Sequence, residues 1–427
     1  MGEYVDNISD FVYIKPLENK NQCIDLSTVT ESEVENVINK LSDSSAPDYD
    51  YLSPKLIKNF AKELAKPLTL LINCSFSSGI FPDVYKIGRI SPIFKSGDMS
   101  DPNNYRPICI LPVFSKVFER ILYERIMSFL TMHSLLNENQ HGFLKNKCTT
   151  TAIFEFIEKI LKGLDNHESV IALLLDLSKA FDCVDHDILL EKLAAIGIRG
   201  IALKLLASYL AHRKQLVTVP SENGNHTSDI LENIFGVPQG SILGPLLFII
   251  YINDLVLFNN ENNFVVKYAD DTSITLKNKN IDVLIREANK LLNEVNTWFR
   301  KNKLKLNANK TNLLGFHLKT NVNKFINQDI KCDDQVVSYV DKTKLLGVTI
   351  DKNLKWNFHI DNLCKRISKL VFALRVLKNS VNQDALKSVY FAHIHSCIIY
   401  GIEFWGQAAE YLFNRVFKLQ KNHQITL

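Results

Sequence analysis

The stretch Val265-Val266-Lys267-Tyr268-Ala269-Asp270-Asp271-Thr272-Ser273-Ile274 places two adjacent aspartates between two β-prone runs. This pattern predicts a β-hairpin with the acids at its turn. Adjacent carboxylates repel each other, so a fold rarely keeps such a pair at a strand end without a cation that neutralises it. Asp270 and Asp271 are therefore predicted to form part of a metal site.

A third aspartate, Asp176, closes the apolar strand signal Ile171–Leu175. A lone aspartate in such a place is usually a cap or turn residue, and we expect capping or structural roles for Asp182, Asp185 and Asp187. Asp176 differs because it lies at the edge of a core and the hairpin supplies two more carboxylates. Carboxylates at the ends of neighbouring strands can hold two Mg²⁺ ions about 3.5–4 Å apart for in-line phosphoryl transfer. The chain is therefore predicted to be a nucleic-acid polymerase.

The composition is that of an ordinary globular protein. The 427 residues are 46% hydrophobic and 22% charged, and the formal net charge of +4 says little about partners by itself. None of the eight cysteines forms a C-x-x-C pair, which argues against a zinc ribbon and fits a reducing compartment. No signal peptide is visible, and the most apolar segment, Ile242–Phe258, is too short and too polar to cross a membrane. We expect a soluble, intracellular protein without a membrane partner, in the nucleus or the cytoplasm.

The first third of the chain is predicted to be mostly helical. Residues 1–45 are polar, with one helix signal that Thr30 or Ser32 would cap. The block from Ser53 to about Ser77 also has helical spacing, and Pro67 is expected to divide it into two helices.

Strand and helix signals alternate through the middle of the chain. A strand that leads into a basic turn is expected over residues 87–98, and further strands over 169–177 and 215–219. Residues 221–227 are expected to form a turn, and 241–257 a buried helix. Such alternation predicts an α+β layered domain.

The loop Gly236-Val237-Pro238-Gln239-Gly240-Ser241 precedes that buried helix. Its glycines permit close approach of the backbone to a ligand. The Gln239 side chain could bind a template base or a nucleotide, and Ser241 could cap the helix. Taken alone, the loop is turn chemistry and nothing more.

The tail from residue 351 onward is predicted to be helical. Between Lys352 and Lys378 there are seven lysines and arginines and one acid, Asp361. This excess is either a solvated helix face or a surface that grips the phosphate backbone of a duplex.

Order and spacing decide among these readings. Asp176 is followed about 60 residues later by Gly-x-Pro-Gln-Gly, and about 30 residues beyond that by Tyr-Ala-Asp-Asp. This resembles motifs A, B and C of reverse transcriptases, most closely the non-LTR (LINE-type) branch and its jockey-like elements. The resemblance covers roughly residues 45–427 and is tightest from 86 to 350. Further segments in family order are Asn104–Ile108, Gln140–Phe143, Leu304–Thr311 and Leu345–Ile350.

The resemblance implies a right-hand polymerase of the α+β class, with fingers, an antiparallel palm sheet and a helical thumb. Residues 1–45 would be an N-terminal extension and 46–350 the fingers and palm, with 86–350 as the core. Residues 351–427 would be a thumb-like region, which we expect to be truncated.

The resemblance also implies the metal ligands. Asp176 and Asp270 would bind directly, Asp271 less directly, and the backbone carbonyl of Leu177 would add a ligand. The cofactor would be two Mg²⁺ ions, with Mn²⁺ as a substitute.

Three cations match residues that act on the triphosphate in the family. Lys95 and Arg106 would contact the incoming nucleotide, and Lys310 would protonate the pyrophosphate. The alternative for Lys95 and Arg106 is a pair of solvated loop cations.

Four more positions match nucleotide and template contacts. Phe181 matches the aromatic gate that excludes a ribose 2′-hydroxyl, although it could be a plain core phenylalanine. Gln239, Gly240 and Tyr268 match residues that line the nucleotide and template site. Leu346-Gly347-Val348 matches the region of the primer grip.

The implied function is RNA-directed DNA polymerase, which adds dNTPs to a primer 3′-hydroxyl on an RNA template. The partners would be an RNA template, a DNA primer, dNTPs and a separate endonuclease, because only about 45 residues precede the matching part. No Cys/His knuckle or RNase H segment is visible, so we expect a fragment. The alternative is a catalytically silent nucleic-acid-binding remnant of such an element. A maturase of the group II intron type or a telomerase-like polymerase fits the motifs less well. Template, priming mode, compartment and oligomeric state stay open.

Overall fold

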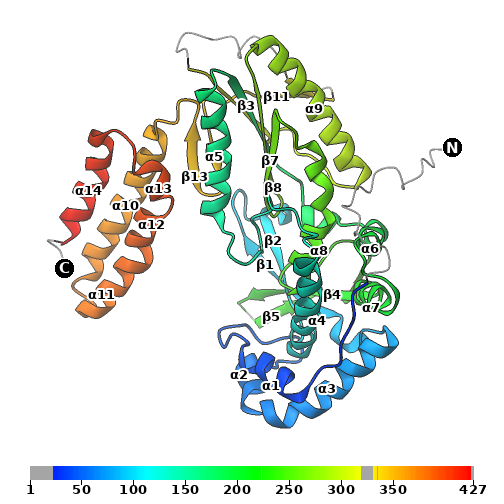
Figure 1. The fold of residues 1–427 in the computed structure, drawn as a ribbon. Helices are drawn as coiled ribbons and strands as arrows, with labels where there is room; N and C mark the ends of the chain where they lie inside the picture. The colour runs from blue at the N-terminus through cyan, green and yellow to red at the C-terminus, as the bar shows by residue number, and fades with distance from the viewer. Residues whose placement is uncertain (1–22, 223, 319–329, 334, 425–427) are drawn as a thin grey trace. The chain divides into compact units, whose positions relative to one another are not determined.

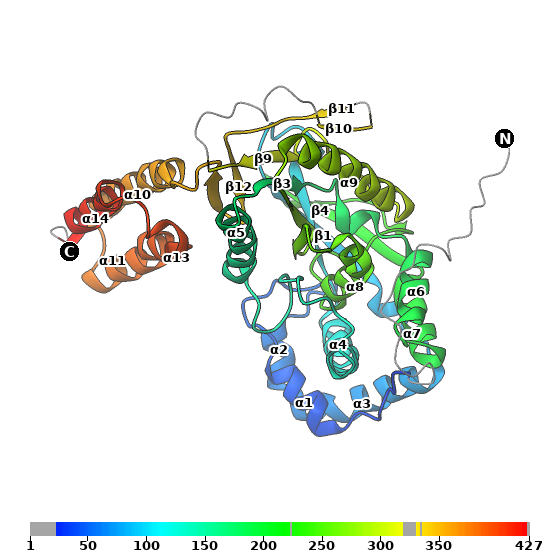
Figure 2. The ribbon, with the colours of Figure 1, turned by 45° about the horizontal axis from the view of Figure 1, so that its top comes forward.

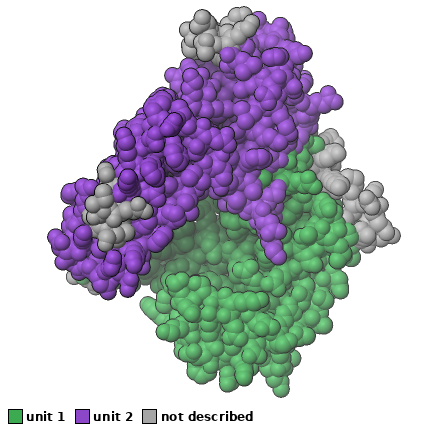
Figure 3. Space-filling view, turned by 60° about the vertical axis from the view of Figure 1, so that its left-hand side comes forward, with its two compact units in different colours: residues 1–143, 177–257, 295–305 green, residues 144–176, 258–294, 306–427 purple. Residues whose placement is uncertain are grey.

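The computed structural model describes residues 23–222, 224–318, 330–333 and 335–424. The chain forms two compact units, coloured separately in Figure 3. Unit 1 comprises the described residues up to Phe143, with Leu177–Leu257 and Val295–Lys305. Unit 2 comprises Leu144–Asp176, Phe258–Glu294 and the described residues from Leu306 onward.

Helices make up most of unit 1. The first begins after Thr30, whose side chain accepts the backbone N–H of Glu33 at 3.3 Å, so the predicted cap is confirmed at one of its two candidates. Val34 and Ile38 of this helix are fully buried, as the spacing of its apolar residues predicts. The helices of unit 1 are α1 (Glu31–Asn39), α2 (Pro54–Asn59), α3 (Ala61–Ser78), α4 (Val113–Met132), α6 (His186–Ala195), α7 (Gly200–Leu210) and α8 (Leu243–Tyr251).

The prediction that Pro67 divides the second helical block is wrong. The break lies at Phe60, and Pro67 sits inside the continuous helix α3. A proline in a helix removes one backbone hydrogen bond. Here the buried face of α3, which includes Leu68, Ile72 and Phe76, keeps the helix continuous across that gap.

The sheet of unit 1 is mixed and has the order β2-β1-β4-β5, with β6 paired to β4. Strand β1 is antiparallel to β2 and parallel to β4. The predicted turn over residues 221–227 is wrong in part, because Gly224–Thr227 is a strand that pairs back onto β4. Its residues are exposed and polar, so backbone pairing rather than an apolar pattern forms it. The strands are β1 (Ile87–Phe94), β2 (Tyr105–Ile110), β4 (Arg213–Ser221), β5 (Gly224–Thr227) and β6 (Leu231–Asn233).

Unit 2 is built on a fully antiparallel sheet of order β7-β8-β3-β9. Every residue of its central strand β3 is buried. Figures 1 and 2 show α5 and α9 on opposite faces of this sheet. Strands and covering helices confirm the predicted α+β class. The elements are α5 (Thr149–Asp165), β3 (Ser169–Leu175), β7 (Asn263–Tyr268), β8 (Asp271–Asn278), β9 (Asn312–Phe316) and α9 (Ile281–Lys301), of which the residues up to Glu294 belong to unit 2.

The rest of unit 2 consists of two small hairpins and then helices, as the loss of strand signals after residue 351 predicts. Trp405 is fully buried at the centre of the helical part. The hairpins are β10 (Ile330–Cys332) with β11 (Gln335–Val337), and β12 (Lys342–Leu345) with β13 (Val348–Asp351). The helices are α10 (Asn357–Leu377), α11 (Gln383–Val389), the π-helical segment Tyr390–His395, α12 (Ser396–Ile399), α13 (Ile402–Trp405) and α14 (Glu410–Gln424).

The apolar segment expected as a buried helix over 241–257 is α8 followed by the 3₁₀ helix η5 (Asn253–Phe258). Residues 243–251 are buried except for Pro245. No helix within the described residues has the length and apolar character needed to span a membrane.

Candidate active site

The aspartate hairpin has the predicted form. Strands β7 and β8 pair down to Tyr268 and Asp271, so Ala269 and Asp270 are the two turn residues. Ala269 has a φ of 55°, a left-handed conformation that costs an alanine energy and that glycine or asparagine would adopt more readily. Such strain is often kept where a side chain must be held in one place. In this turn the side chain next to the strained residue is that of Asp270.

Asp176 lies at the same end of the sheet. The final pair of the β3–β8 ladder is Leu175 with Thr272, and one more step of this antiparallel register sets Asp176 opposite Asp271. The backbone carbonyl of Asp176 accepts the N–H of Asn307 at 2.8 Å, which ties its strand end to the turn before β9. Unit 2 therefore brings the three predicted carboxylates to one strand end.

The exposure of these aspartates suits a hydrated cation. Asp176 and Asp270 are half-buried and Asp271 is exposed. Among the described residues no group of three or more His, Cys, Asp or Glu forms a metal cage. Mg²⁺ does not need one, because it is commonly held by one or two carboxylates, waters and substrate phosphates. The oxygen donors present fit that ion.

Lys310 and Tyr268 are the other predicted site residues of unit 2. Tyr268 is half-buried at the end of β7. Lys310 is exposed, and its N–H donates to the carbonyl of Asn307 at 3.1 Å. Because Asn307 also bonds to Asp176, the turn that carries Lys310 is connected to the carboxylate end of the sheet.

The glycine–proline loop lies in unit 1 and is bound along its length to the segment after Asp176. The N–H of Gly236 donates to Val184 at 2.8 Å, and that of Val237 donates to the carbonyl of Phe181 at 2.9 Å. A Cβ atom on Gly236 would lie 2.8 Å from the backbone of Asp182, so only glycine allows this approach. The sequence motifs A and B are thus joined by backbone hydrogen bonds.

The other end of the loop contacts strand β2. The carbonyl of Gln239 accepts the N–H of Cys109 at 2.7 Å. Gly240 has a φ of +119°, and a Cβ there would lie 2.5 Å from the carbonyl oxygen of Cys109. The predicted close approach of glycine backbone is therefore made to a strand of the protein itself.

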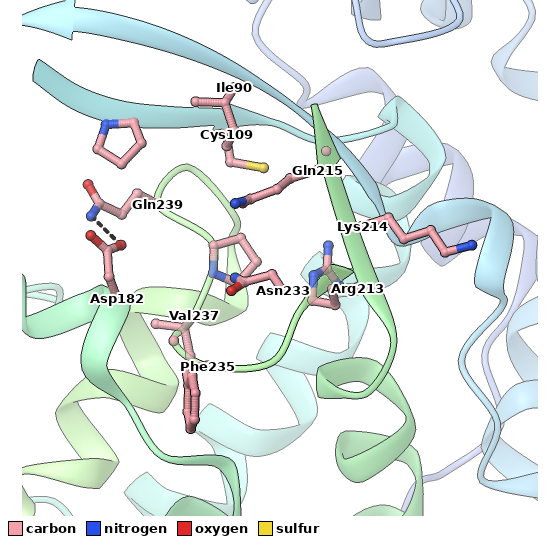
Figure 4. Close-up of a pocket in the computed structure, with 14 residues that line it drawn as sticks. Ile90, Cys109, Asp182, Arg213, Lys214, Gln215, Asn233, Phe235, Val237 and Gln239 are labelled. Atoms are coloured by element: carbon pink, nitrogen blue, oxygen red, sulfur yellow. Dashed lines mark hydrogen bonds between the residues drawn. The ribbon is translucent and has the colours of Figure 1, made fainter. Parts of the chain in front are cut away.

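The side chain of Gln239 has a protein partner that sequence reasoning missed. Its amide donates to the carboxylate of Asp182 at 2.8 Å, on the wall of a pocket of about 200 Å³ (Figure 4). Burial raises the pKa of Asp182, and this hydrogen bond opposes the rise. Asp182 was expected to be a cap or structural residue. No local pattern could pair two residues 57 positions apart.

Phe181 is half-buried in unit 1. Its ring stacks on Phe248 with a centroid distance of 4.3 Å and meets Phe143 edge-on at 6.3 Å. These contacts hold the ring in one orientation. These contacts are compatible with Phe181 as a core residue, and they also give its ring the rigidity that a steric gate needs.

Lys95 and Arg106 lie at the loop end of the β1–β2 hairpin of unit 1, beside the Phe94–Tyr105 pair. Both are exposed. Arg106 pairs with Ile93 across the hairpin, and the N–H of Lys95 donates to Asn104 at 2.9 Å. The structure thus brings these two cations to one hairpin, while the three aspartates belong to unit 2.

The predicted basic tail and primer-grip region lie in unit 2. Leu346 and Gly347 form the tight turn between β12 and β13, with φ values of 45° and 91°. The hydroxyl of Tyr400 donates to the carbonyl of Leu346. On α10 the cations Lys365, Arg366, Lys369 and Arg375 are exposed, whereas Ile367, Val371 and Leu374 are buried.

Comparison with known proteins places this chain in a family. Residues 93–350 match the family model described as "Reverse transcriptase (RNA-dependent DNA polymerase)". In Drosophila melanogaster, the RNA-directed DNA polymerase from mobile element jockey is 27% identical over 92% of this chain and 43% of the relative. The probable RNA-directed DNA polymerases from transposons BS and X-element are each 28% identical, over 92% and 91% of this chain and 44% and 42% of the relatives.

The chain thus spans less than half the length of the curated relatives it matches. The family model covers more than half of the chain, and the relatives bear out the expected likeness to jockey-like elements. The chain belongs to the reverse transcriptase (RNA-dependent DNA polymerase) family.

Proposed function

We propose that the protein is an RNA-directed DNA polymerase that adds dNTPs to a primer 3′-hydroxyl on an RNA template by two-metal phosphoryl transfer. The observation that carries this proposal is the meeting of Asp176, Asp270 and Asp271 at one end of the antiparallel sheet, in a chain of the reverse transcriptase family.

The carboxylates of Asp176 and Asp270 would hold Mg²⁺ directly, with Asp271 and the carbonyl of Leu177 completing the set and Mn²⁺ as a substitute. When bound, the metal supplies an activated primer hydroxyl and stabilises the charge of the triphosphate. The turn at Ala269, whose φ is 55°, would fix the backbone next to Asp270 before substrate arrives.

The remaining roles fall to cations that offset negative charge. Lys95 and Arg106 would neutralise the triphosphate as charge develops on the leaving pyrophosphate. Lys310, on the turn that bonds to the carbonyl side of Asp176, would donate a proton to that pyrophosphate.

Four further residues would select substrate. Phe181, fixed by two aromatic neighbours, would exclude the 2′-hydroxyl of an NTP. Gln239, Gly240 and Tyr268 would contact the template and the incoming nucleotide.

The right-hand architecture is proposed on the same grounds. The sheet β7-β8-β3-β9 would be the palm and the helices from α10 onward the thumb. The β1–β2 hairpin and the helices before it would belong to the fingers. In residue terms this keeps 1–45 as an extension, 46–350 as fingers and palm, and 351–427 as the thumb.

The partners follow from the reaction. They are an RNA template, a DNA primer and dNTPs inside the cell, with a separate endonuclease to create the primer end. Binding to the duplex would use the exposed cations of α10 on phosphates, so affinity should fall as salt rises. The alternative function is a silent nucleic-acid-binding remnant of a mobile element.

Primer extension on poly(rA)/oligo(dT) with Mg²⁺ and labelled dTTP tests the proposal. Wild-type protein should incorporate dTTP, and Asp270→Ala should lower the rate by at least about 100-fold because several kcal/mol of charge stabilisation are lost. Asp341→Ala is the matched control, since Asp341 is an exposed aspartate of the same unit that forms an ion pair with Lys352 at the surface.

Two results would contradict the proposal. Full activity in Asp270→Ala would refute the metal-site assignment. If the wild type binds the primer–template and incorporates nothing, the silent remnant is the better function.

A further inference from the structure

A fully buried carboxylate joins two helices of unit 1. Glu119 lies in the middle of α4 and has no exposed surface. One of its carboxylate oxygens accepts the backbone N–H groups of Ile242 at 2.7 Å and Leu243 at 3.2 Å, and the other accepts the Ser115 hydroxyl at 3.1 Å. The two amides belong to the start of α8, where a helix leaves its first N–H groups without helical partners. Glu119 thus caps a helix from 123 residues away.

Burial of the Glu119 carboxylate costs free energy, because the charged form loses its hydration. Burial raises the pKa of Glu119, while the positive charge of Arg213 and the two amides oppose that rise. Arg213, at the start of β4, is itself only 4% exposed and donates to the carbonyl of Tyr209 at 3.2 Å. An apolar side chain of similar size could fill the space without desolvating a charge. The directed hydrogen bonds to α8 are what a carboxylate adds at this position.

The start of α8 is tied to the loop that carries Gln239. The Ser241 hydroxyl donates to the carbonyl of Pro238 at 2.9 Å and accepts the N–H of Gly244 at 2.8 Å. These hydrogen bonds connect the loop to the first turn of α8. Gln239 and Arg213 line the same pocket in Figure 4.

We propose that Glu119 is a positioning residue: by gripping the first turn of α8 it fixes the Gly236–Ser241 loop and so the place of Gln239. The role of Gln239 in nucleotide or template contact rests on the proposed function, whereas the position of the loop does not. The competing explanation is that Glu119 adds only general stability to unit 1.

Hydrogen exchange of backbone amides in the full-length chain separates these explanations without any need for activity. The amide of Cys109 reports on the loop because it donates to the carbonyl of Gln239. In Glu119→Gln, which keeps the size and removes the charge, the amides of Cys109 and Leu243 should exchange about tenfold faster, since hydrogen bonds to charged groups are the stronger ones. The other amides of β2 should keep their wild-type rates.

Asp48→Asn is the matched control. Asp48 is also a buried carboxylate, 2% exposed, and its oxygen accepts the N–H of Val113 at the start of α4 at 2.9 Å. Its carboxylate also accepts the N–H groups of Asp50 and Leu52, so its hydrogen bonds go to segments other than the loop and the Cys109 amide should be unaffected in this variant. A folded Glu119→Gln protein with wild-type protection at Cys109 would overturn the proposal, as would equal effects in the two variants.

Kinetics add a second arm. Glu119→Gln should raise the KM for dNTP about tenfold with a smaller change in kcat. When Gln239 is already replaced by alanine, Glu119→Gln should raise the KM less than twofold further, because both substitutions remove the same contact. If the effects of the two substitutions on KM multiply in the double variant, Glu119 does not act through Gln239. If the wild type extends no primer, the proposed function fails while the exchange result still decides the position of the loop.

A milder variant covers the case in which Glu119→Gln does not fold. Ser115→Ala removes one donor to the carboxylate and should speed exchange of the Cys109 amide about threefold. No change at that amide would again refute the proposal.

Discussion

Replacing Asp254 with alanine is expected to destabilise unit 1 by about 3–5 kcal/mol. Its carboxylate lies 2.9 Å from the Lys192 ammonium, and both side chains are 2% exposed. The ammonium also donates to the carbonyl of Tyr251 at 2.6 Å and lies 5.0 Å from the ring centres of Tyr251 and Trp298. The substitution would leave a charge buried without its counter-ion.

The expected loss of stability is large because the Lys192–Asp254 pair is buried. Solvent screens most surface pairs to roughly 0–1 kcal/mol. The pair of Lys58 with Asp43, whose carboxylate is 64% exposed, is of that kind. Asp43→Ala is therefore the control and should cost less than about 1 kcal/mol. The difference between the two variants measures what burial adds.

A change in pH should reveal the stranded charge. Burial lowers the pKa of Lys192 from its ordinary 10.5, and Asp254 opposes that fall. In Asp254→Ala the folded-state pKa falls further, so between that pKa and about 10.5 the unfolded state binds more protons than the folded state. The free energy of unfolding of the variant should therefore rise from pH 7 toward pH 10, relative to wild type.

Urea denaturation followed by circular dichroism, at pH 7 and pH 9.5, measures both effects. Replacing the pair together, with Lys192→Met and Asp254→Leu, should recover most of the loss because no charge is left buried. A loss below about 1 kcal/mol in Asp254→Ala, or no recovery at high pH, would refute this account of the pair.

Three further substitutions test the site and the fold. Gly240→Ala should cost more than about 1 kcal/mol and lower primer extension, because φ is +119° and the new Cβ would meet the Cys109 carbonyl; wild-type melting and extension would contradict this. Phe181→Ala should lower the preference for dNTPs over NTPs, measured as the ratio of their kcat/KM values, at least tenfold. The melting temperature is measured as well, because the variant also loses the stack on Phe248. An unchanged preference for dNTPs would refute the role of Phe181 as a steric gate. Burial lowers the pKa of His359 to about 4, so between pH 6.5 and pH 4 the unfolded state binds a proton that the folded state does not, and the free energy of unfolding should fall as the pH falls. In urea titrations, His359→Gln should make the free energy of unfolding depend less on pH over this range. Equal pH dependence in the variant and the wild type would refute this role of His359.

The wrong expectations about secondary structure have separate causes. Pro67 is a local signal for a helix break, yet the packed face of α3 outweighs the one hydrogen bond that a proline removes. Residues Gly224–Thr227 have no apolar alternation, yet they pair with β4 because its edge offers backbone partners. Tertiary packing decides the first case, and backbone pairing within a hairpin decides the second.

The sequence by itself determined the aspartate hairpin, the strand that ends at Asp176 and the order of the motifs, because these are patterns within a few residues or along the chain. They were enough for the α+β class and for the family. The pairing of Gln239 with Asp182 and the cap that Glu119 places on α8 were decided only by the tertiary structure. The first joins two side chains 57 residues apart, and the second joins a side chain to a backbone N–H 123 residues away. Their energies depend on burial and hydrogen-bond geometry, which exist only once the chain has folded.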